Sequence, residues 1–241
     1  MNDTEKLYIV IPAYNEAENI SSVIHAWCKY VIHGGGYTHK LLVIDDGSTD
    51  NTFAIMKSCA QGHPEIIPLT KTNSGHGATL LFGYKYALEH GADYVFQTDS
   101  DGQTLPSEFP AFWALRHEYD AVLGSRPNRE DGASRKFIEL VLRMILRVIF
   151  GVSVPDANAP FRLMKASLLR KYLSRIPEDY NIPNVMLTTY FAYFHENIAF
   201  RKITFRPRQG GKNSINMRKI FKIGVKAVKD FANFRRDMKN A

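Results

Sequence analysis

The sequence predicts an α/β fold with a mainly parallel, Rossmann-like central sheet flanked by helices. Apolar runs alternate with helical patterns through the first half of the chain, and the main runs end at clusters of polar residues. The 241 residues are 45% apolar, which is enough to bury one large core. Alternating strands and helices are typical of βαβ units.

The expected elements follow one another in a regular order. Short apolar runs predict strands over residues 6–14, 39–48, 65–70 and 93–99. Helices are predicted over 16–31, 50–60 and 76–91. The first helix carries Ile20, Val23, Ile24 and Trp27 at helical spacing, and Gly91 closes the third.

Polar clusters follow three of these strands. They are PAYNE at residues 12–16, DDGSTD at 45–50 and TDSDGQT at 98–104. Ligands of open α/β sheets bind beyond the carboxyl ends of the strands, where the loops converge. We therefore expect these three clusters to meet at one edge of the sheet.

Asp99 and Asp101 place two carboxylates one residue apart at the end of a strand. Like charges this close raise each other's pKa unless a cation or a shared proton relieves them, so a divalent metal is the first candidate. An EF-hand is excluded because its glycine belongs at position six and Gly102 stands at position four. The D-x-D-G-T motif of haloacid-dehalogenase phosphatases is disfavoured because Gln103 precedes Thr104.

The positive charge is concentrated at the C-terminal end. Residues 1–200 carry a net charge of −4, whereas residues 201–241 carry +11. Such a segment suits an anionic partner, either a phosphate-bearing substrate, a membrane surface or nucleic acid, or it is a solvated helix face. We expect one domain over residues 1–212, followed by a basic amphipathic arm over 213–241.

Residues 134–151 form a densely apolar helical pattern. Its polar stripe has a spacing of four and consists of Arg135, Glu139, Arg143 and Arg147. Such a helix is either deeply packed or lies in a membrane interface, and it cannot span a bilayer. Residues 215–234 show a second, basic amphipathic pattern.

The cysteines, the N-terminus and several motifs that the sequence lacks exclude other classes of protein. Cys28 and Cys59 form no CxxC pair and predict no metal-ligand cluster, which fits a reducing compartment. The acidic N-terminus resembles no signal peptide, so a cytoplasmic location is expected. The sequence shows no nucleic-acid-binding module and no G-x-G-x-x-G dinucleotide fingerprint. His76 and His195 are interpreted as loop or surface residues.

Four motifs, in this order and spacing, carry a family resemblance. VIPAYNEAENI, LLVIDDGSTDNT, NSGHGATLLFGYKYALEHGADYVFQTDSDGQ and AVLGSR resemble the family-2 glycosyltransferases of GT-A fold over residues 7–126. VPDANAPFRLMKASLL and FRPRQGGKNSIN are similar to the dolichol-phosphate mannose synthase branch, which acts on polyprenyl phosphates. The likeness then extends to about residue 216.

The resemblance implies a metal-dependent site for a nucleotide sugar. Asp99, Asp101 and Gln103 match a D-x-D-x-Q metal motif and supply oxygen ligands suited to Mg²⁺ or Mn²⁺. The ion would stabilise the departing diphosphate. The implied nucleotide-sugar residues are Pro12, Tyr14, Glu16, Asp45 or Asp46, Gly75, Asp99, Asp101 and Arg208, and Gly77 would also allow close backbone approach.

The resemblance also implies that arginines bind the phosphate of the acceptor, the molecule that receives the sugar. Arg126 and Arg135 match positions that hold the acceptor phosphate in the resembling branch, and Arg162 is a further candidate. Asp156 is a possible catalytic base beside Asp101 and Arg126. The branch often has Thr-Ser-Gly where this chain has Asn158, Ala159 and Pro160, which leaves the acceptor open.

The resulting expectation is an inverting glycosyltransferase. It moves a sugar from UDP- or GDP-sugar to a polyprenyl phosphate, attached peripherally at the cytoplasmic face of the membrane. One alternative is transfer onto a growing glycan or another hydroxyl acceptor, which needs a deprotonating carboxylate. A second is a nucleotide-sensing, membrane-attached binding module with an inactive site.

Overall fold

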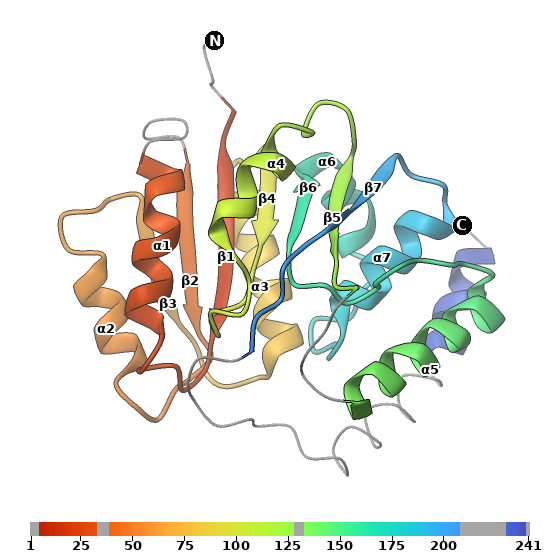
Figure 1. Cartoon of the computed structure of the whole chain (residues 1–241), viewed down its shortest axis with the longest axis horizontal. Coiled ribbons are helices and arrows are strands. Elements are labelled where there is room, and N and C mark those ends of the chain that lie inside the picture. The colour runs from red at the N-terminus through yellow and green to blue at the C-terminus, as the bar shows by residue number, and fades with distance from the viewer. Residues whose placement is uncertain (1–4, 33–38, 128–132, 208–229, 240–241) are drawn as a thin grey trace.

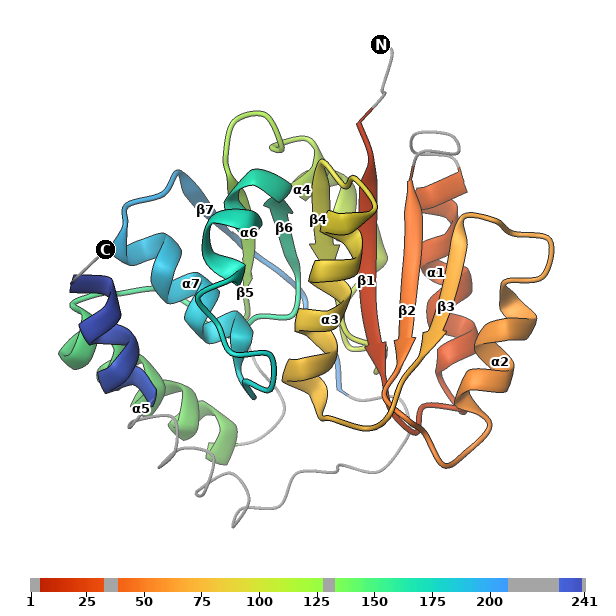
Figure 2. The same ribbon diagram turned by 180° about the vertical axis from the view of Figure 1, so that it is seen from behind.

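A seven-stranded sheet lies between two layers of helices (Figure 1). The computed structural model describes residues 5–32, 39–127, 133–207 and 230–239. Helices α1, α2 and α4 lie on the face turned to the viewer in Figure 1, and α3, α6 and α7 on the opposite face, seen in Figure 2. This three-layer arrangement confirms the predicted fold class.

The first half of the chain contains every predicted strand and helix. The elements are β1 (Leu7–Ala13), α1 (Ile20–Ile32), β2 (Lys40–Asp45), α2 (Thr52–Cys59), β3 (Ile66–Thr70), α3 (His76–Glu89) and β4 (Tyr94–Gln97). β1 pairs with β2 and β4, and β2 pairs with β3, all in parallel. α1 begins four residues later than expected because the Glu16 carbonyl first accepts the backbone N–H groups of Asn19 and Ile20 in a turn.

The second half completes the sheet with shorter elements. They are η2 (Pro106–Glu108), α4 (Phe109–Trp113), β5 (Ala121–Ser125), α5 (Ala133–Phe150), β6 (Arg162–Lys165), α6 (Ala166–Leu173), α7 (Pro183–Tyr193) and β7 (Ile198–Lys202), and residues 230–239 are helical. The strand order is β3-β2-β1-β4-β6-β5-β7. β6 runs antiparallel to both β4 and β5. Its amino end therefore lies at the edge where the other strands have their carboxyl ends.

Both faces of the sheet are buried, which explains why its strands are apolar throughout instead of alternating. Along β1, Leu7, Ile9 and Ile11 pack with α1, α2 and α4. Tyr8 and Val10 pack on the other face with α3, α6 and α7. The functional edge is thus held between two separate hydrophobic clusters.

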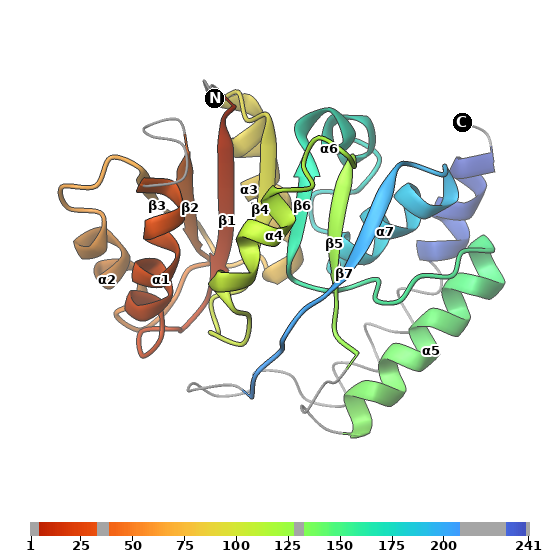
Figure 3. The same cartoon turned by 45° about the horizontal axis from the view of Figure 1, so that its top comes forward.

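Helix α5 packs into the core along one side, and its membrane-interface alternative stays a prediction. Leu146 and Phe150 are buried in the core, whereas Leu140, Met144 and Val148 form an exposed apolar stripe, with Val148 84% exposed. Figure 3 shows α5 along the margin of the molecule, beside the C-terminal helix. Within the described ranges, no helix combines the length and apolar content needed to cross a bilayer.

The described end of the predicted C-terminal arm packs on the domain. Phe231, Phe234 and Met238 are buried in the core. The rings of Phe231 and Phe150 lie 5.7 Å apart between centroids, and those of Phe234 and Tyr180 lie 5.2 Å apart. The boundary at residue 212 falls outside the described residues and stays a prediction.

Candidate active site

The three polar clusters meet at the carboxyl edge of the sheet, as expected. β1 lies between β2 and β4, so the loops that follow these strands are neighbours. The backbone N–H of Asn15 donates to Ser48 Oγ at 2.9 Å, and that of Glu16 donates to Thr52 Oγ1 at 2.9 Å. The backbone N–H of Asp46 donates to the Ala13 carbonyl at 2.9 Å. The loops after β1 and β2 are therefore tied together.

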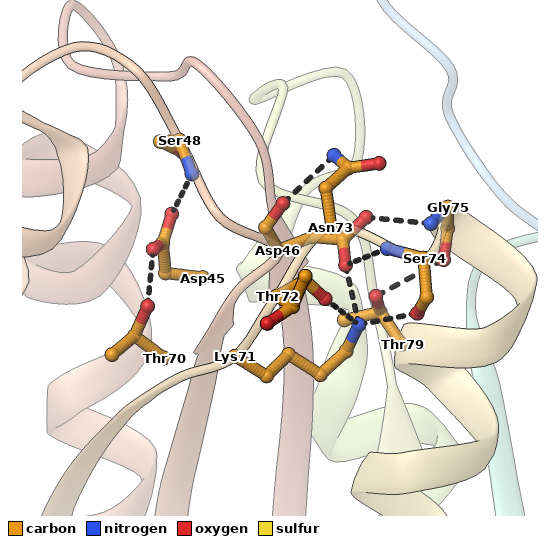
Figure 4. Close-up of polar contacts among 10 residues, drawn as sticks. All are labelled: Asp45, Asp46, Ser48, Thr70, Lys71, Thr72, Asn73, Ser74, Gly75 and Thr79. Atoms are coloured by element: carbon orange, nitrogen blue, oxygen red, sulfur yellow. Dashed lines mark hydrogen bonds and ion pairs between the residues drawn. The ribbon is translucent and has the colours of Figure 1, made fainter.

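Asp46 organises the loop that leads into α3 (Figure 4). Its carboxylate accepts hydrogen bonds from Lys71 Nζ and from the backbone N–H groups of Ser74 at 2.9 Å and Gly75 at 2.8 Å. Burial on its own raises the pKa of Asp46, but these hydrogen bonds prevail and hold it below its usual value. Asp46 is thus a structural anion around which residues 71–75 are arranged.

Asp45 is also satisfied from within the protein. Its two oxygens accept from the Ser48 backbone N–H at 3.1 Å and from Thr70 Oγ1 at 2.6 Å. Both Asp45 and Asp46 are buried. A contact of either carboxylate with a nucleotide base stays a prediction.

The two glycines before and within the first turn of α3 serve different purposes. Gly75 has a φ of 92°, which other residues rarely adopt, and a Cβ there would meet no atom within 4 Å. A Cβ at Gly77 would lie 2.2 Å from the Tyr180 carbonyl oxygen. Gly77 is therefore required by packing, whereas Gly75 faces open space that a ligand can approach.

The loop after β1 presents one open aromatic ring. Tyr14 is 43% exposed, while Pro12 is buried within β1 beside Ile44 of β2. Glu16 is buried, and its Oε2 accepts from Asn19 Nδ2 at 3.0 Å. Tyr14 thus has the exposure that stacking on a base requires.

Asp99 and Asp101 follow β4 at the same edge. Asp99 Oδ1 accepts from Gln97 Nε2 at 3.0 Å, and Asp101 Oδ1 accepts from the Gln103 backbone N–H at 3.1 Å. The Gln103 side chain is buried and donates to the Arg206 carbonyl at 2.8 Å. Each member of the predicted metal motif is therefore held by a hydrogen bond.

The electrostatics of Asp99 fit a divalent cation. Burial, followed by the charge of Asp101, raises its pKa to about 8, although Arg126 and the bond from Gln97 act in the opposite direction. A carboxylate in this state favours a proton or a cation. Oxygen ligands from two carboxylates are the donor set that Mg²⁺ and Mn²⁺ take when substrate phosphates complete their coordination.

His76 also reaches this site. It is the first residue of α3, and its Nε2 lies 3.9 Å from Asp99 Oδ1. Its side chain is about half exposed, in agreement with the surface interpretation. Its proximity to Asp99 was missed because nothing in the local sequence pairs a histidine at this position with a carboxylate 23 residues later.

Arg126 and Asp156 bind each other. Arg126 follows β5, and Asp156 lies in the segment before β6. Arg126 Nε donates to Asp156 Oδ2 at 2.8 Å, and its Nη2 donates to Oδ1 at 3.0 Å. Both side chains are buried. The two predicted acceptor-side groups thus form a bidentate ion pair of the strong, orientation-fixing type.

A buried polar chain runs from Arg162 to Asp99. Arg162 Nη1 donates to the Asn184 carbonyl at 2.9 Å and its Nη2 to Thr188 Oγ1 at 2.7 Å. Asn184 Nδ2 donates to Gln97 Oε1 at 3.0 Å, and Gln97 in turn donates to Asp99. The sequence interpretation missed Gln97 and Asn184, although a glutamine in the buried strand YVFQ is a usable signal.

Arg162 itself is only 1% exposed, and burial lowers its pKa to about 10. The contacts above are all with protein groups, so its role at an acceptor phosphate stays a prediction. Arg208 lies outside the described residues. Arg135 lies on α5, but its side chain is outside the described part of the structure.

Comparisons with known proteins identify the family of this chain. The sequence profile of Glycosyl transferase family 2 matches residues 8–173. The undecaprenyl-phosphate 4-deoxy-4-formamido-L-arabinose transferase of Pseudomonas savastanoi pv. phaseolicola is 27% identical over 172 residues, which cover 69% of this chain and 49% of that protein. The chain therefore spans about half the length of that relative. The undecaprenyl-phosphate mannosyltransferase of Micrococcus luteus is 27% identical over 220 residues, 88% of each chain.

Solved structures share the fold. Glucosyl-3-phosphoglycerate synthase from Mycobacterium tuberculosis, in complex with Mn²⁺, uridine diphosphate and glucosyl-3-phosphoglycerate, superposes with a TM-score of 0.69 at 18% identity. The match covers 96% of this chain and 80% of that one. Because the family profile takes in all three polar clusters and the structural match extends over nearly the whole chain, this protein has the GT-A fold and belongs to glycosyl transferase family 2.

Proposed function

We propose that this glycosyltransferase moves a sugar from a UDP- or GDP-sugar to a polyprenyl phosphate, with inversion at the anomeric carbon. The observation that carries the proposal is the pair Asp99 and Asp101 beyond β4, with the pKa of Asp99 raised by burial and by its neighbour. The names of the two relatives, both transferases to undecaprenyl phosphate, support the acceptor class.

On the donor side, Asp99 and Asp101, with Gln103 beside them, would hold Mg²⁺ or Mn²⁺. When bound, such an ion supplies Lewis-acid stabilisation of the charge on a departing nucleoside diphosphate. Tyr14 offers its exposed ring to the base. Asp46 fixes residues 71–75, which places the open side of Gly75 toward the donor.

The proposed reaction is a single in-line displacement. An oxygen of the acceptor phosphate forms a bond to the anomeric carbon as the bond from that carbon to the diphosphate oxygen breaks. A phosphate is already anionic at neutral pH, so it needs no general base, and positioning is sufficient. The bidentate bonds from Arg126 to Asp156 support this choice, because a hydroxyl acceptor would require Asp156 to accept a proton instead.

Helix α5 supports action at a membrane surface. Its exposed stripe of Leu140, Met144 and Val148 lies beside the exposed Arg143 and Arg147. Apolar side chains flanked by cations are the pattern that interfacial helices present to anionic lipid. We place this surface at the cytoplasmic leaflet as part of the proposal.

The test is transfer of radiolabelled sugar from UDP- and GDP-sugars into an organic-extractable lipid, with purified polyprenyl phosphate and Mn²⁺. Asp101→Asn is expected to lower the rate by about 10²- to 10³-fold, because a charge-stabilising group is removed. Glu89→Gln, at an exposed position at the opposite end of α3 from His76, is the matched control. Label found only in a water-soluble glycan would favour the hydroxyl acceptor, and no turnover of any donor would favour the binding module.

A further inference from the structure

A second group of metal-ligating side chains lies at the opposite edge of the sheet. It comprises Cys28 on α1, His63 in the turn after α2 and Glu65 just before β3. One potential ligand atom from each of the three residues lies within 4.8 Å of the other two. In Figure 1 the end of α1 and the start of β3 lie at the upper edge, away from the carboxyl ends of the strands. This group is therefore separate from the donor site.

The chemistry of the three ligands is that of a zinc centre. Thiolate, imidazole and carboxylate are the ligands that Zn²⁺ takes in tetrahedral sites, whereas Mg²⁺ prefers oxygen alone. Zinc–sulfur and zinc–nitrogen bonds of usual length place ligand atoms about 3.5 Å apart. Nδ1 of His63 and Glu65 Oε1 now share a hydrogen bond of 2.9 Å, so these two atoms would separate slightly around an ion. The ligand atoms all lie within 4.8 Å of one another, so shifts of about 1 Å are sufficient.

A metal ion can reach these three residues from solvent and can take a fourth ligand there. Cys28 and Glu65 are buried, but the His63 side chain is 46% exposed, so an ion can reach the group from solvent. A water molecule can complete the tetrahedron.

We propose that Cys28, His63 and Glu65 bind a zinc ion that ties α1 to the turn before β3. The sequence alone predicts no metal-ligand cluster around the cysteines, because the ligands are 35 and two residues apart and match no short motif. The fold brings them together because α1 packs beside α2 and β2, and α2 packs beside β3. The role is structural, since the ion lies at the edge away from the transfer site.

The test is a titration of the full chain with Co²⁺, followed by absorption spectroscopy. Binding is expected to produce a near-ultraviolet thiolate-to-cobalt charge-transfer band that saturates at one ion per chain and disappears when Zn²⁺ is added. Cys28→Ser should abolish the band. His63→Asn and Glu65→Gln should weaken Co²⁺ binding at least tenfold, because removal of even an outer-shell partner costs about 10- to 100-fold.

Two controls distinguish binding at this site from binding at the donor site, and a loss of binding from misfolding. Asp99→Asn should leave the band unchanged, since that residue belongs to the donor site. His63 is exposed, so His63→Asn is expected to fold, and Zn²⁺ should raise the thermal unfolding midpoint of the unmodified protein but not of this variant. The proposal is overturned if no band forms, if the band survives in Cys28→Ser, or if it responds to Cys59→Ser but not to His63→Asn and Glu65→Gln.

Discussion

At Asp99, burial and the charge of Asp101 raise the carboxyl pKa to about 8 from an ordinary value of 3.8. The folded protein without metal therefore retains a proton that the unfolded chain releases. The corresponding stability is fully present below the unfolded pKa and is lost as the pH rises through the folded pKa. Asp99 thus favours the folded state in acid and opposes it in weak base.

The first prediction follows from this direction of the pH dependence of stability. In metal-free protein, the free energy of unfolding should contain a contribution that falls between about pH 4 and pH 8. Asp99→Asn should remove this contribution and make the protein more stable than the parent above pH 8. Urea unfolding across the pH range measures it, with Glu89→Gln, at an exposed position, as a control that keeps the parental profile. An unchanged slope in Asp99→Asn would refute the assignment.

The second prediction concerns the buried pair Arg126 and Asp156. Arg126→Met removes the guanidinium that binds both oxygens of the buried Asp156 carboxylate, which should cost about 3–5 kcal/mol of unfolding free energy. The double variant Arg126→Met with Asp156→Leu should recover most of that loss, because no charge is left buried. Chemical denaturation gives both values.

A matched comparison for this pair is Lys165 with Asp120, a partly exposed ion pair with an N–O distance of 2.9 Å. Lys165→Met should cost only about 0–1 kcal/mol, because solvent screens the pair. Similar losses at Arg126 and Lys165 would show that burial does not set the strength of the first pair.

At the scale of elements, β4 and α7 are joined by the bond from Asn184 to Gln97. Asn184→Ala should leave Gln97 free to turn away from Asp99. We expect Mn²⁺ affinity to fall by about 10- to 100-fold, as for other partners that orient metal ligands. Calorimetric titration measures the affinity.

The control for this third prediction is Tyr84→Phe. The Tyr84 hydroxyl donates to Asn184 Oδ1 at 2.9 Å, so its removal spares the bond between Asn184 and Gln97. Mn²⁺ affinity should be retained in Tyr84→Phe. Equal losses in both variants would mean that general loosening, and not the link to Asp99, is responsible.

The fourth prediction belongs to α5. Val148→Glu places a charge in the exposed apolar stripe and should weaken sedimentation with vesicles that contain anionic lipid by about 10- to 100-fold, the equivalent of one apolar side chain lost from burial. Phe82→Glu, at an exposed apolar position on α3, is the matched control and should bind normally. Unchanged binding of Val148→Glu would exclude the stripe as the lipid contact.

The elements differ in how far the sequence determines them. The strands and helices up to Gln97 were predicted because each apolar run is long and is followed by a clear loop signal. β6 is four residues long and antiparallel, and the residues with which it pairs in β5 and β4 lie between 39 and 71 positions earlier in the chain. No local pattern encodes that position.

The candidate site also has one part that local sequence predicts and one part that depends on distant contacts. The edge that gathers Tyr14, Asp46 and Asp99 follows from strand order alone. By contrast, Arg126 and Asp156 were assigned separate tasks, acceptor binding and proton transfer, and the fold binds them to each other. Local sequence shows which groups carry charge, but it does not show which charges become partners.

At the scale of the whole molecule, the proposed function divides the protein into a donor half and an acceptor half. The proposed donor residues come from the loops after β1, β2 and β4, whereas the proposed acceptor residues Arg126, Asp156 and Arg162 follow β5, precede β6 and begin β6. The apolar clusters on both faces of the sheet hold the two halves in place.

The fifth prediction tests the two halves together. In a thermal unfolding panel of UDP- and GDP-sugars, one donor should raise the midpoint in the presence of Mn²⁺ and not without it, with about 2.7 kcal/mol of stabilisation at a concentration 100 times its dissociation constant. Asp101→Asn should lose that shift, whereas Glu89→Gln should keep it. An equal shift without Mn²⁺ would contradict metal-assisted donor binding.

The reversed direction of β6 has a consequence for how such a protein changes over time. β4 and β6 meet along a short seam in which Tyr94 faces Lys165 and Gln97 faces Arg162. Under the proposed function, insertions or replacements in the stretch that enters β6 would alter the recipient side first. New recipients would then require changes to one loop, with the strands that carry the nucleotide side retained.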